Sequence, residues 1–273
     1  MKRALIAGFL ACAVLGAILL AVRISGGWPL PDAMPPQGEA YEPKAAAEGH
    51  YVLSPAVSER FIREPENTWS NLSYIITGTI TFSIAVTFLG RSIGMATMGV
   101  GVASFLYHAS SARMVRNWDV GAMDFLCVLL LVRCAGIFVP SLSRRIQDDR
   151  FAILAGSIVL AAFLAIERNA PIGPIKPFAL TYFTSFTVLV VLAALAVIAS
   201  RDSASKISRS AYFVVGWLFA LGSAFQTGDH PGNWLFHPGA TIQAHALWHI
   251  GSALAVGWAA WILDRADRPN IAA

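Results

Sequence analysis

Long apolar segments recur along this chain, and their lengths restrict the folds that it can adopt. After an apolar run at residues 4–22, seven further segments cover about 71–90, 93–108, 119–139, 151–166, 178–200, 211–226 and 242–263. A bilayer offers the backbone no hydrogen-bond partners, so segments of this length cross it as helices. Only 13% of residues are charged, against about 25% in a typical soluble domain. The sequence predicts an all-α transmembrane bundle of seven core helices plus one N-terminal helix.

The N-terminal apolar run has two interpretations. Lys2 and Arg3 precede it and Arg23 follows it, as in a signal sequence. The apolar core of a cleaved signal is typically only about 7–15 residues long. We therefore favour a retained signal-anchor helix at residues 1–23, with a cleaved signal sequence as the alternative.

The rest of the chain divides by composition. Residues 24–69 are polar and punctuated by prolines, which predicts an extramembrane segment leading into a core domain at 70–264 and a tail at 265–273. Arginine and lysine gather in loops 140–150 and 200–209 and in the tail. The positive-inside rule assigns that side to the cytoplasm.

Charge and cysteine content exclude other classes. The net charge of +4 is modest and its basic residues lie in short loops, so no nucleic-acid partner is predicted. All three cysteines lie in apolar segments, and we interpret them as packing residues without disulfides.

A histidine pair is the strongest chemical signal. His245 and His249 are four residues apart in the last apolar segment, so a helix places both imidazoles on one face, one turn apart. Histidine is costly inside a membrane without a partner, and two converging nitrogens favour a divalent metal. Haem is disfavoured, because its histidines usually come from facing helices.

Other polar residues are predicted at the same, non-cytoplasmic side. Ser104 and His108 lie near the exit of the second core helix, and Asp119 opens the third after a loop at 109–118. Three imidazoles would leave the fourth position of a tetrahedral zinc ion open, as catalytic sites do. Asp119 could then transfer the proton of the zinc-activated water, and Ser104 could stabilise an oxyanion.

Each residue also has a structural interpretation. His108 could simply hydrogen-bond across helices, Asp119 could be the N-cap of its helix, and Ser104 could be a helix-contact residue. We expect structural roles for Asp124 and Arg133, which lie deeper in the third segment, or snorkelling for the arginine. Among loop residues, Asp229 and His237 could line a cavity mouth, while surface positions are the default.

These residues together resemble the alkaline ceramidases. The resemblance rests on three motifs, which are Ser-Phe-Leu-Tyr-His at 104–108 followed by Asp119, His-Ala-Leu-Trp-His at 245–249, and Arg-Glu-Pro-Glu-Asn-Thr-Trp-Ser-Asn at 63–71. It covers about residues 45–263. The family belongs to a superfamily of seven-helix membrane hydrolases and receptors that includes the adiponectin-receptor-like proteins.

The resemblance implies a zinc-dependent hydrolase. Zinc would be held by His108, His245 and His249, with Ser104 and Asp119 as catalytic residues. The reaction would convert ceramide, taken from the bilayer, to a sphingoid base and a fatty acid. A receptor-like lipid-binding protein of the same superfamily and a zinc lipid esterase are the alternatives. The expected location is a bacterial inner membrane, with the site facing the non-cytoplasmic side.

A calcium site is a further implication. Some family members bind calcium before the first core helix, and Glu64 matches the last acidic residue of that segment, with Glu59 as a second candidate. The chain departs from the family here. The upstream acidic motif normally contains a cysteine, and this chain has none between Cys12 and Cys127.

Overall fold

The chain forms a helical bundle. The computed structural model describes residues 2–25, 28, 61–139, 141–142, 145–146, 149–150, 153–158, 176–201, 209–228, 235 and 242–266. Of these described residues, 89% are helical and none lies in a strand. Three helical stretches within them are long and apolar enough to cross a membrane, namely Phe88–Ser110, Val115–Phe138 and Ala244–Arg265. The all-α class is thus confirmed and an integral membrane protein is supported. Seven core helices and a signal anchor remain predictions.

The helices follow the expected order. Their bounds are α1 Lys2–Ile24, α4 Pro65–Ser70, α5 Leu72–Ile84, α6 Phe88–Ser110, α7 Arg113–Phe138, α10 Lys176–Arg201, α11 Arg209–Gly228 and α12 Ala244–Arg265. The first core segment, expected to run to residue 90, ends earlier, at Ile84, and α6 begins at Phe88. Of the fourth expected segment, 151–166, the structure describes only residues 153–158, which are helical.

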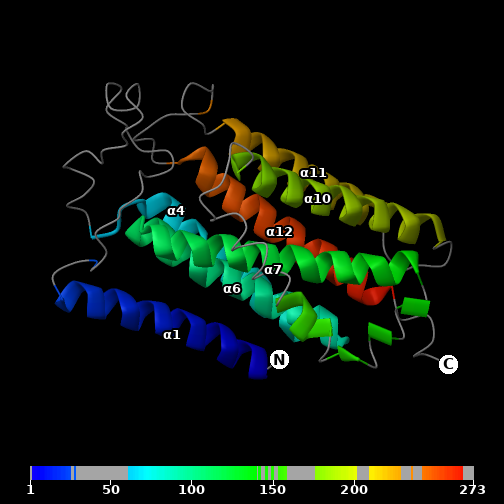
Figure 1. Ribbon diagram of the computed structural model, residues 1–273, viewed down its shortest axis with the longest axis horizontal. Coiled ribbons are helices and arrows are strands. Elements are labelled where there is room, and N and C mark those ends of the chain that lie inside the picture. Colours follow the sequence, from blue (N-terminus) through cyan, green and yellow to red (C-terminus); the bar gives the residue numbers. More distant parts are fainter. Residues whose placement is uncertain are drawn as a thin grey trace.

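The helices lie side by side along the long axis of the molecule (Figure 1), with α1 along one edge and α10 and α11 along the other. Helix α6 packs between α5 and α7, and α12 packs against both α5 and α11. A continuous apolar core joins the helices from α5 to α12, with Ile93, Leu129 and Ala253 almost fully buried in it. The core sets the positions of the polar residues at the ends of the helices.

Helices α5 and α6 approach closely at Gly78. A Cβ atom there would lie 2.7 Å from both the Gly94 carbonyl oxygen and the Met98 nitrogen. Apolar attraction contributes little between helices inside a bilayer, so close packing across small residues stabilises their pairing. This contact fixes α6, and with it His108, relative to the start of α5.

The connection from α6 to α7 is much shorter than expected. Only Ser111 and Ala112 separate the two helices, whereas the sequence predicts a loop at 109–118. Ser111 adopts the left-handed conformation, with φ of 49°, and Ser110 Oγ accepts a hydrogen bond from the Ala112 nitrogen at 3.2 Å. The polar first turns of α7 have the composition of a loop, which explains the difference.

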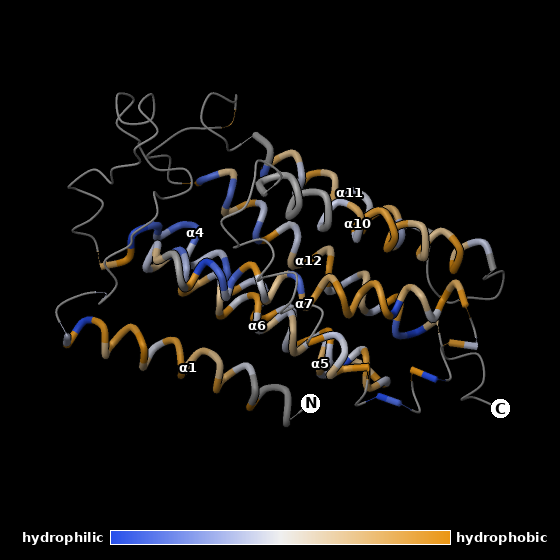
Figure 2. Tube along the Cα trace, in the orientation of Figure 1, coloured by the Kyte–Doolittle hydropathy of each residue, from blue (hydrophilic) through white to orange (hydrophobic). Residues whose placement is uncertain are grey.

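The end of the bundle remote from the histidines is held by different polar contacts. Asp264 accepts hydrogen bonds from the backbone nitrogens of Val86 at 2.9 Å and Thr87 at 3.1 Å. Arg133 is buried and donates to the Leu263 carbonyl, in line with its expected structural role. Hydrophilic residues also gather on α4 and at the start of α12 (Figure 2), which is the end of the bundle that contains the histidines.

Candidate metal centre

Three histidines from two helices meet at one end of the bundle. His108 lies in the last turn of α6, while His245 and His249 occupy the first turns of α12. One ligand nitrogen from each lies within 4.8 Å of the other two, and the ring centroids are 4.6–5.1 Å apart. Their exposed fractions of 1%, 9% and 4% shield the cluster from bulk water. The structure therefore brings together all three predicted metal ligands.

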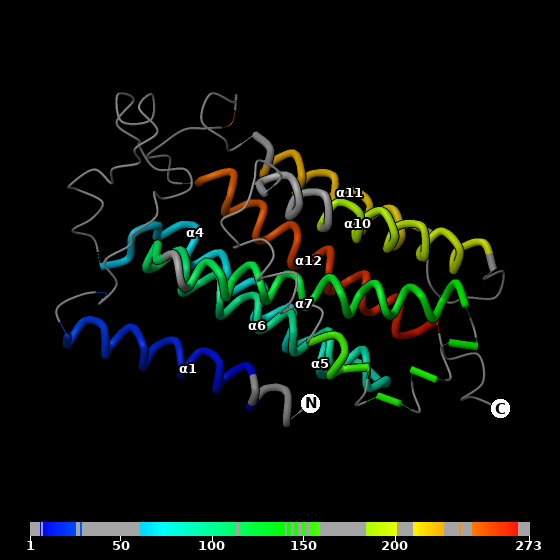
Figure 3. The backbone as a smooth tube through the Cα atoms, in the orientation of Figure 1, coloured from blue at the N-terminus to red at the C-terminus, as the bar shows by residue number. Residues whose placement is uncertain are grey.

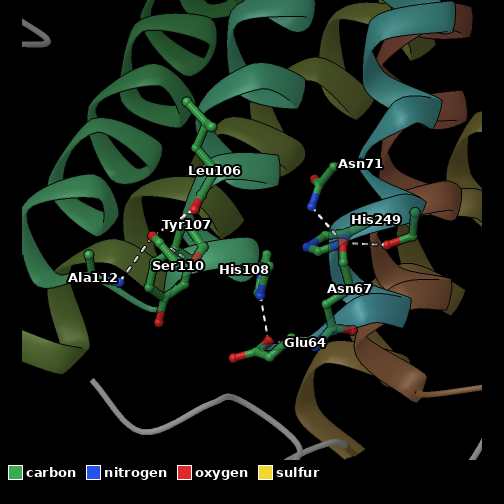
Figure 4. Close-up of polar contacts among 10 residues, drawn as sticks. Glu64, Asn67, Asn71, Leu106, Tyr107, His108, Ser110, Ala112 and His249 are labelled. Carbon is green, nitrogen blue, oxygen red and sulfur yellow. Dashed lines mark hydrogen bonds and ion pairs between the residues drawn. The ribbon is translucent and has the colours of Figure 1, made fainter. Parts of the chain in front are cut away.

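Glu64 orients the imidazole of His108 (Figure 4). Its Oε2 atom lies 2.6 Å from His108 Nδ1 and accepts a second hydrogen bond, at 2.9 Å, from Asn67 Nδ2. The backbone joins the same two segments, because the Glu64 nitrogen donates to the His108 carbonyl at 3.2 Å. A carboxylate can only accept, so His108 carries its proton on Nδ1 and presents the lone pair of Nε2.

Ser70 has the same role for His249. Its Oγ atom lies 2.8 Å from His249 Nδ1 and donates its one proton to the Asn67 carbonyl at 2.9 Å. The hydroxyl is then free to accept the Nδ1 proton of His249, and the Asn67 carbonyl is a second acceptor for that imidazole. His249 also presents the lone pair of Nε2. The short helix α4, which packs against the start of α12 (Figure 3), therefore sets the tautomers of two histidines from different helices.

This arrangement fits a metal ion. Metal-bound histidines almost always donate the second ring N–H to a carboxylate, carbonyl or similar acceptor, which fixes the tautomer and the ring orientation. Both outer hydrogen bonds are present here, on His108 and His249. Nitrogen ligands of a tetrahedral zinc lie roughly 3.3 Å apart, given Zn–N bonds of about 2.0–2.1 Å, and small side-chain rotations would bring the three imidazoles to that spacing.

The two predicted catalytic residues lie close to each other. Ser104, one turn before His108, hydrogen-bonds to the Asp119 carboxyl, and His108 and Arg116 act on that carboxyl electrostatically. Asp119 is buried, and its Oδ1 atom hydrogen-bonds to no residue of the described ranges. The interpretation of Asp119 as an N-cap is wrong. Ala112 occupies that position, and Asp119 lies within α7, two turns from its start.

Sequence reasoning missed part of this site. Ser70 and Asn67 were not predicted to have any role, although both belong to the motif at 63–71. Glu64 was a calcium candidate, and the structure places it against the histidine cluster. Glu59, Asp229 and His237 lie outside the described residues. The calcium site stays a prediction.

No protein-family model matches the chain, and a search of curated proteins finds no match either. The functional argument therefore rests on the chain's own residues and on the resemblance in its motifs.

Proposed function

We propose that this protein is a zinc-dependent hydrolase of membrane lipid amides, which converts ceramide to a sphingoid base and a fatty acid. The main support is the buried cluster of His108, His245 and His249, combined with two outer hydrogen bonds that orient its nitrogens. Three neutral histidines favour zinc over the hard cations, which prefer oxygen ligands. The motif resemblance to the alkaline ceramidases supports the choice of substrate.

Zinc held by the three imidazoles would supply a water of lowered pKa and a Lewis acid for the amide carbonyl. Asp119, as a carboxylate, would be suited to take a proton from the attacking water. It would then return that proton to the nitrogen as the C–N bond breaks, which would yield a free amine and a carboxylic acid. Ser104 donates a hydrogen bond to the Asp119 carboxyl in the structure. We therefore propose that Ser104 mainly orients this carboxyl. Stabilising an oxyanion would require its hydroxyl to rotate.

The depth of the site suits a lipid amide. Trp69 and Trp118 are exposed at the same end of the bundle as the histidines, with exposed fractions of 49% and 56%. Tryptophan is enriched where the hydrocarbon core meets the polar headgroups. A ceramide presents its amide at that level, below a small head and above two apolar chains. We infer that the amide bond would approach the buried cluster from the bilayer at this level.

The decisive experiment is hydrolysis of a labelled ceramide by detergent-purified protein, with and without a zinc chelator. A glycerolipid ester with matched acyl chains serves as the second substrate. We expect chelator-sensitive release of fatty acid from ceramide. Release from the ester alone would establish a zinc lipid esterase. No turnover of either lipid by protein that binds one zinc per chain would identify a receptor-like lipid-binding protein and refute the hydrolase.

The proposal also includes a cellular location. We propose a bacterial inner membrane with the histidine end of the bundle on the non-cytoplasmic side, which is the orientation that the positive-inside pattern of the loops favours. A cysteine placed at Trp69, labelled from outside intact cells with a membrane-impermeant thiol reagent, tests this orientation.

A further inference from the structure

Helix α1 contacts the bundle through a single stripe of residues. Gly8, Leu15 and Val22, spaced seven apart, are buried. Residues between them on the same face are partly buried, namely Ala11, Ile18 and Leu19. Alternating steps of three and four residues are the pattern of helices packed along a seam. The other faces are exposed, at Ile6, Phe9, Leu10, Val14, Leu20 and Ile24.

The stripe fits specific partners in the core. A Cβ atom at Gly8 would lie 2.5 Å from Thr79 Oγ1 of α5, so the two helices meet closely where Gly8 has no side chain. Leu15 belongs to an apolar cluster with Ile75 of α5 and Phe105 of α6. Signal sequences need only apolar character and a cleavage site. Complementary packing of this kind is instead the mark of a helix that belongs to the folded bundle.

Residues at the end of α1 and just after it contact the segment that carries Glu64. The Trp28 indole donates its Nε1 proton to the Phe61 carbonyl at 2.9 Å, and the Arg23 guanidinium lies 5.8 Å from the centroid of the Phe61 ring. Three residues later, Glu64 bonds to His108. The backbone of residues 61–64 is joined to α6 by hydrogen bonds from the Arg63 nitrogen to the Ala109 carbonyl and from the Glu64 nitrogen to the His108 carbonyl, both 3.2 Å.

We propose that α1 remains in the mature protein and that Trp28 is a positioning residue of the metal centre. This inference rests on the zinc site proposed above. Trp28 holds Phe61, which limits the freedom of residues 61–64 and so keeps the Glu64 carboxylate against His108. Loss of α1 would remove the contacts that Trp28 and Arg23 make with Phe61 at the start of that segment.

The test compares the wild type with Trp28→Phe, which keeps an aromatic ring and removes the indole N–H. Leu20→Ala, on the exposed face of α1, is the control. Intact mass of protein purified from membranes should show residues 1–25 still attached. Trp28→Phe should bind zinc up to about 5-fold more weakly in competition with a chelator, the value of one hydrogen bond. It should also change the visible absorption of the cobalt-substituted protein, which a loss of stability alone would not do. Leu20→Ala should leave both unchanged.

The outcomes separate this inference from the proposed function. A purified protein cleaved after α1 that still binds zinc would overturn the role of α1 and leave the hydrolase intact. Equal zinc affinity and equal cobalt spectra in the wild type and Trp28→Phe would overturn the positioning role of Trp28 and leave the hydrolase intact. A full-length wild type that binds no zinc would overturn both. Gly8→Leu, expected to clash with Thr79, should reproduce the weaker zinc binding, and normal affinity in that variant would also contradict the role of α1.

Discussion

Glu64 Oε2 lies 2.6 Å from Nδ1 of His108, although 44 residues separate the two side chains in sequence. Both side chains are almost completely buried. A carboxylate is costly in such surroundings without hydrogen-bond donors, and here the imidazole and Asn67 both donate to it. The contact aligns His108, a candidate metal ligand in α6, with the segment that leads into α4, so a change at Glu64 is expected to affect both the fold of this segment and the proposed metal binding.

Replacing Glu64 by glutamine should weaken zinc binding. The amide carries no charge and accepts the Nδ1 proton less strongly, so His108 becomes a poorer ligand. Loss of such an outer partner typically lowers metal affinity about 10–100-fold. Chelator competition measures the change, and Glu66→Gln, in the neighbouring α4, is the matched control. Equal affinities in the two variants would show that Glu64 does not support the metal.

Ser70→Ala should have a smaller effect of the same kind. It removes one acceptor of the imidazole proton of His249 and leaves the Asn67 carbonyl as the other; a neutral hydrogen bond is worth about 1 kcal/mol, or at most roughly 5-fold in zinc affinity. Ser70→Thr keeps the hydroxyl and should restore most of the binding. Ser73→Ala is the control, because the Ser73 hydroxyl donates to the backbone carbonyls of Ser70 and His249 and, among the described residues, to no imidazole nitrogen. If threonine fails to rescue, the hydroxyl is not the group that matters.

Metal binding and catalysis should separate between His249 and Asp119. His249→Ala removes a ligand and should abolish both bound zinc and ceramide hydrolysis. Asp119→Asn keeps the shape of the side chain but cannot take a proton, so activity should fall about 10²–10⁴-fold while zinc content stays at the wild-type level. Metal analysis and turnover are measured on the same samples. Turnover retained in both variants would rule out the mechanism.

Much of the candidate metal centre could be predicted because its signals are local or periodic. A spacing of four residues places His245 and His249 on one helix face, and the alternation of helices puts His108 at the same end of the bundle. The structure brings the three together. Ser70, by contrast, contacts His249 across 179 positions. A serine near a helix start has many ordinary uses, and nothing local reveals a partner so distant in sequence.

The turn between α6 and α7 could not be predicted for a different reason. Polarity was the only guide to where helices end, and the first two turns of α7 contain Arg113, Arg116 and Asn117. At the level of the headgroups such residues are compatible with a helix, because water can reach them. The helix therefore extends past the apolar segment, and Asp119 lies within it rather than at its start.

Ser111→Gly should stabilise the protein. Ser111 has a φ of 49°, a conformation that costs L-residues about 1–2 kcal/mol and glycine nothing. Its hydroxyl is also buried and hydrogen-bonds to no residue in the described part of the chain. Glycine loses about 0.5–1 kcal/mol through greater freedom when unfolded, which leaves a net gain of about 1 kcal/mol. The thermal midpoint in detergent should rise by roughly 2–4 °C.

Ser111→Ala removes the hydroxyl but keeps the strained backbone, so it should gain less. A midpoint of the glycine variant below that of the alanine variant by the full entropic cost of glycine would show that the conformation of residue 111 carries no strain.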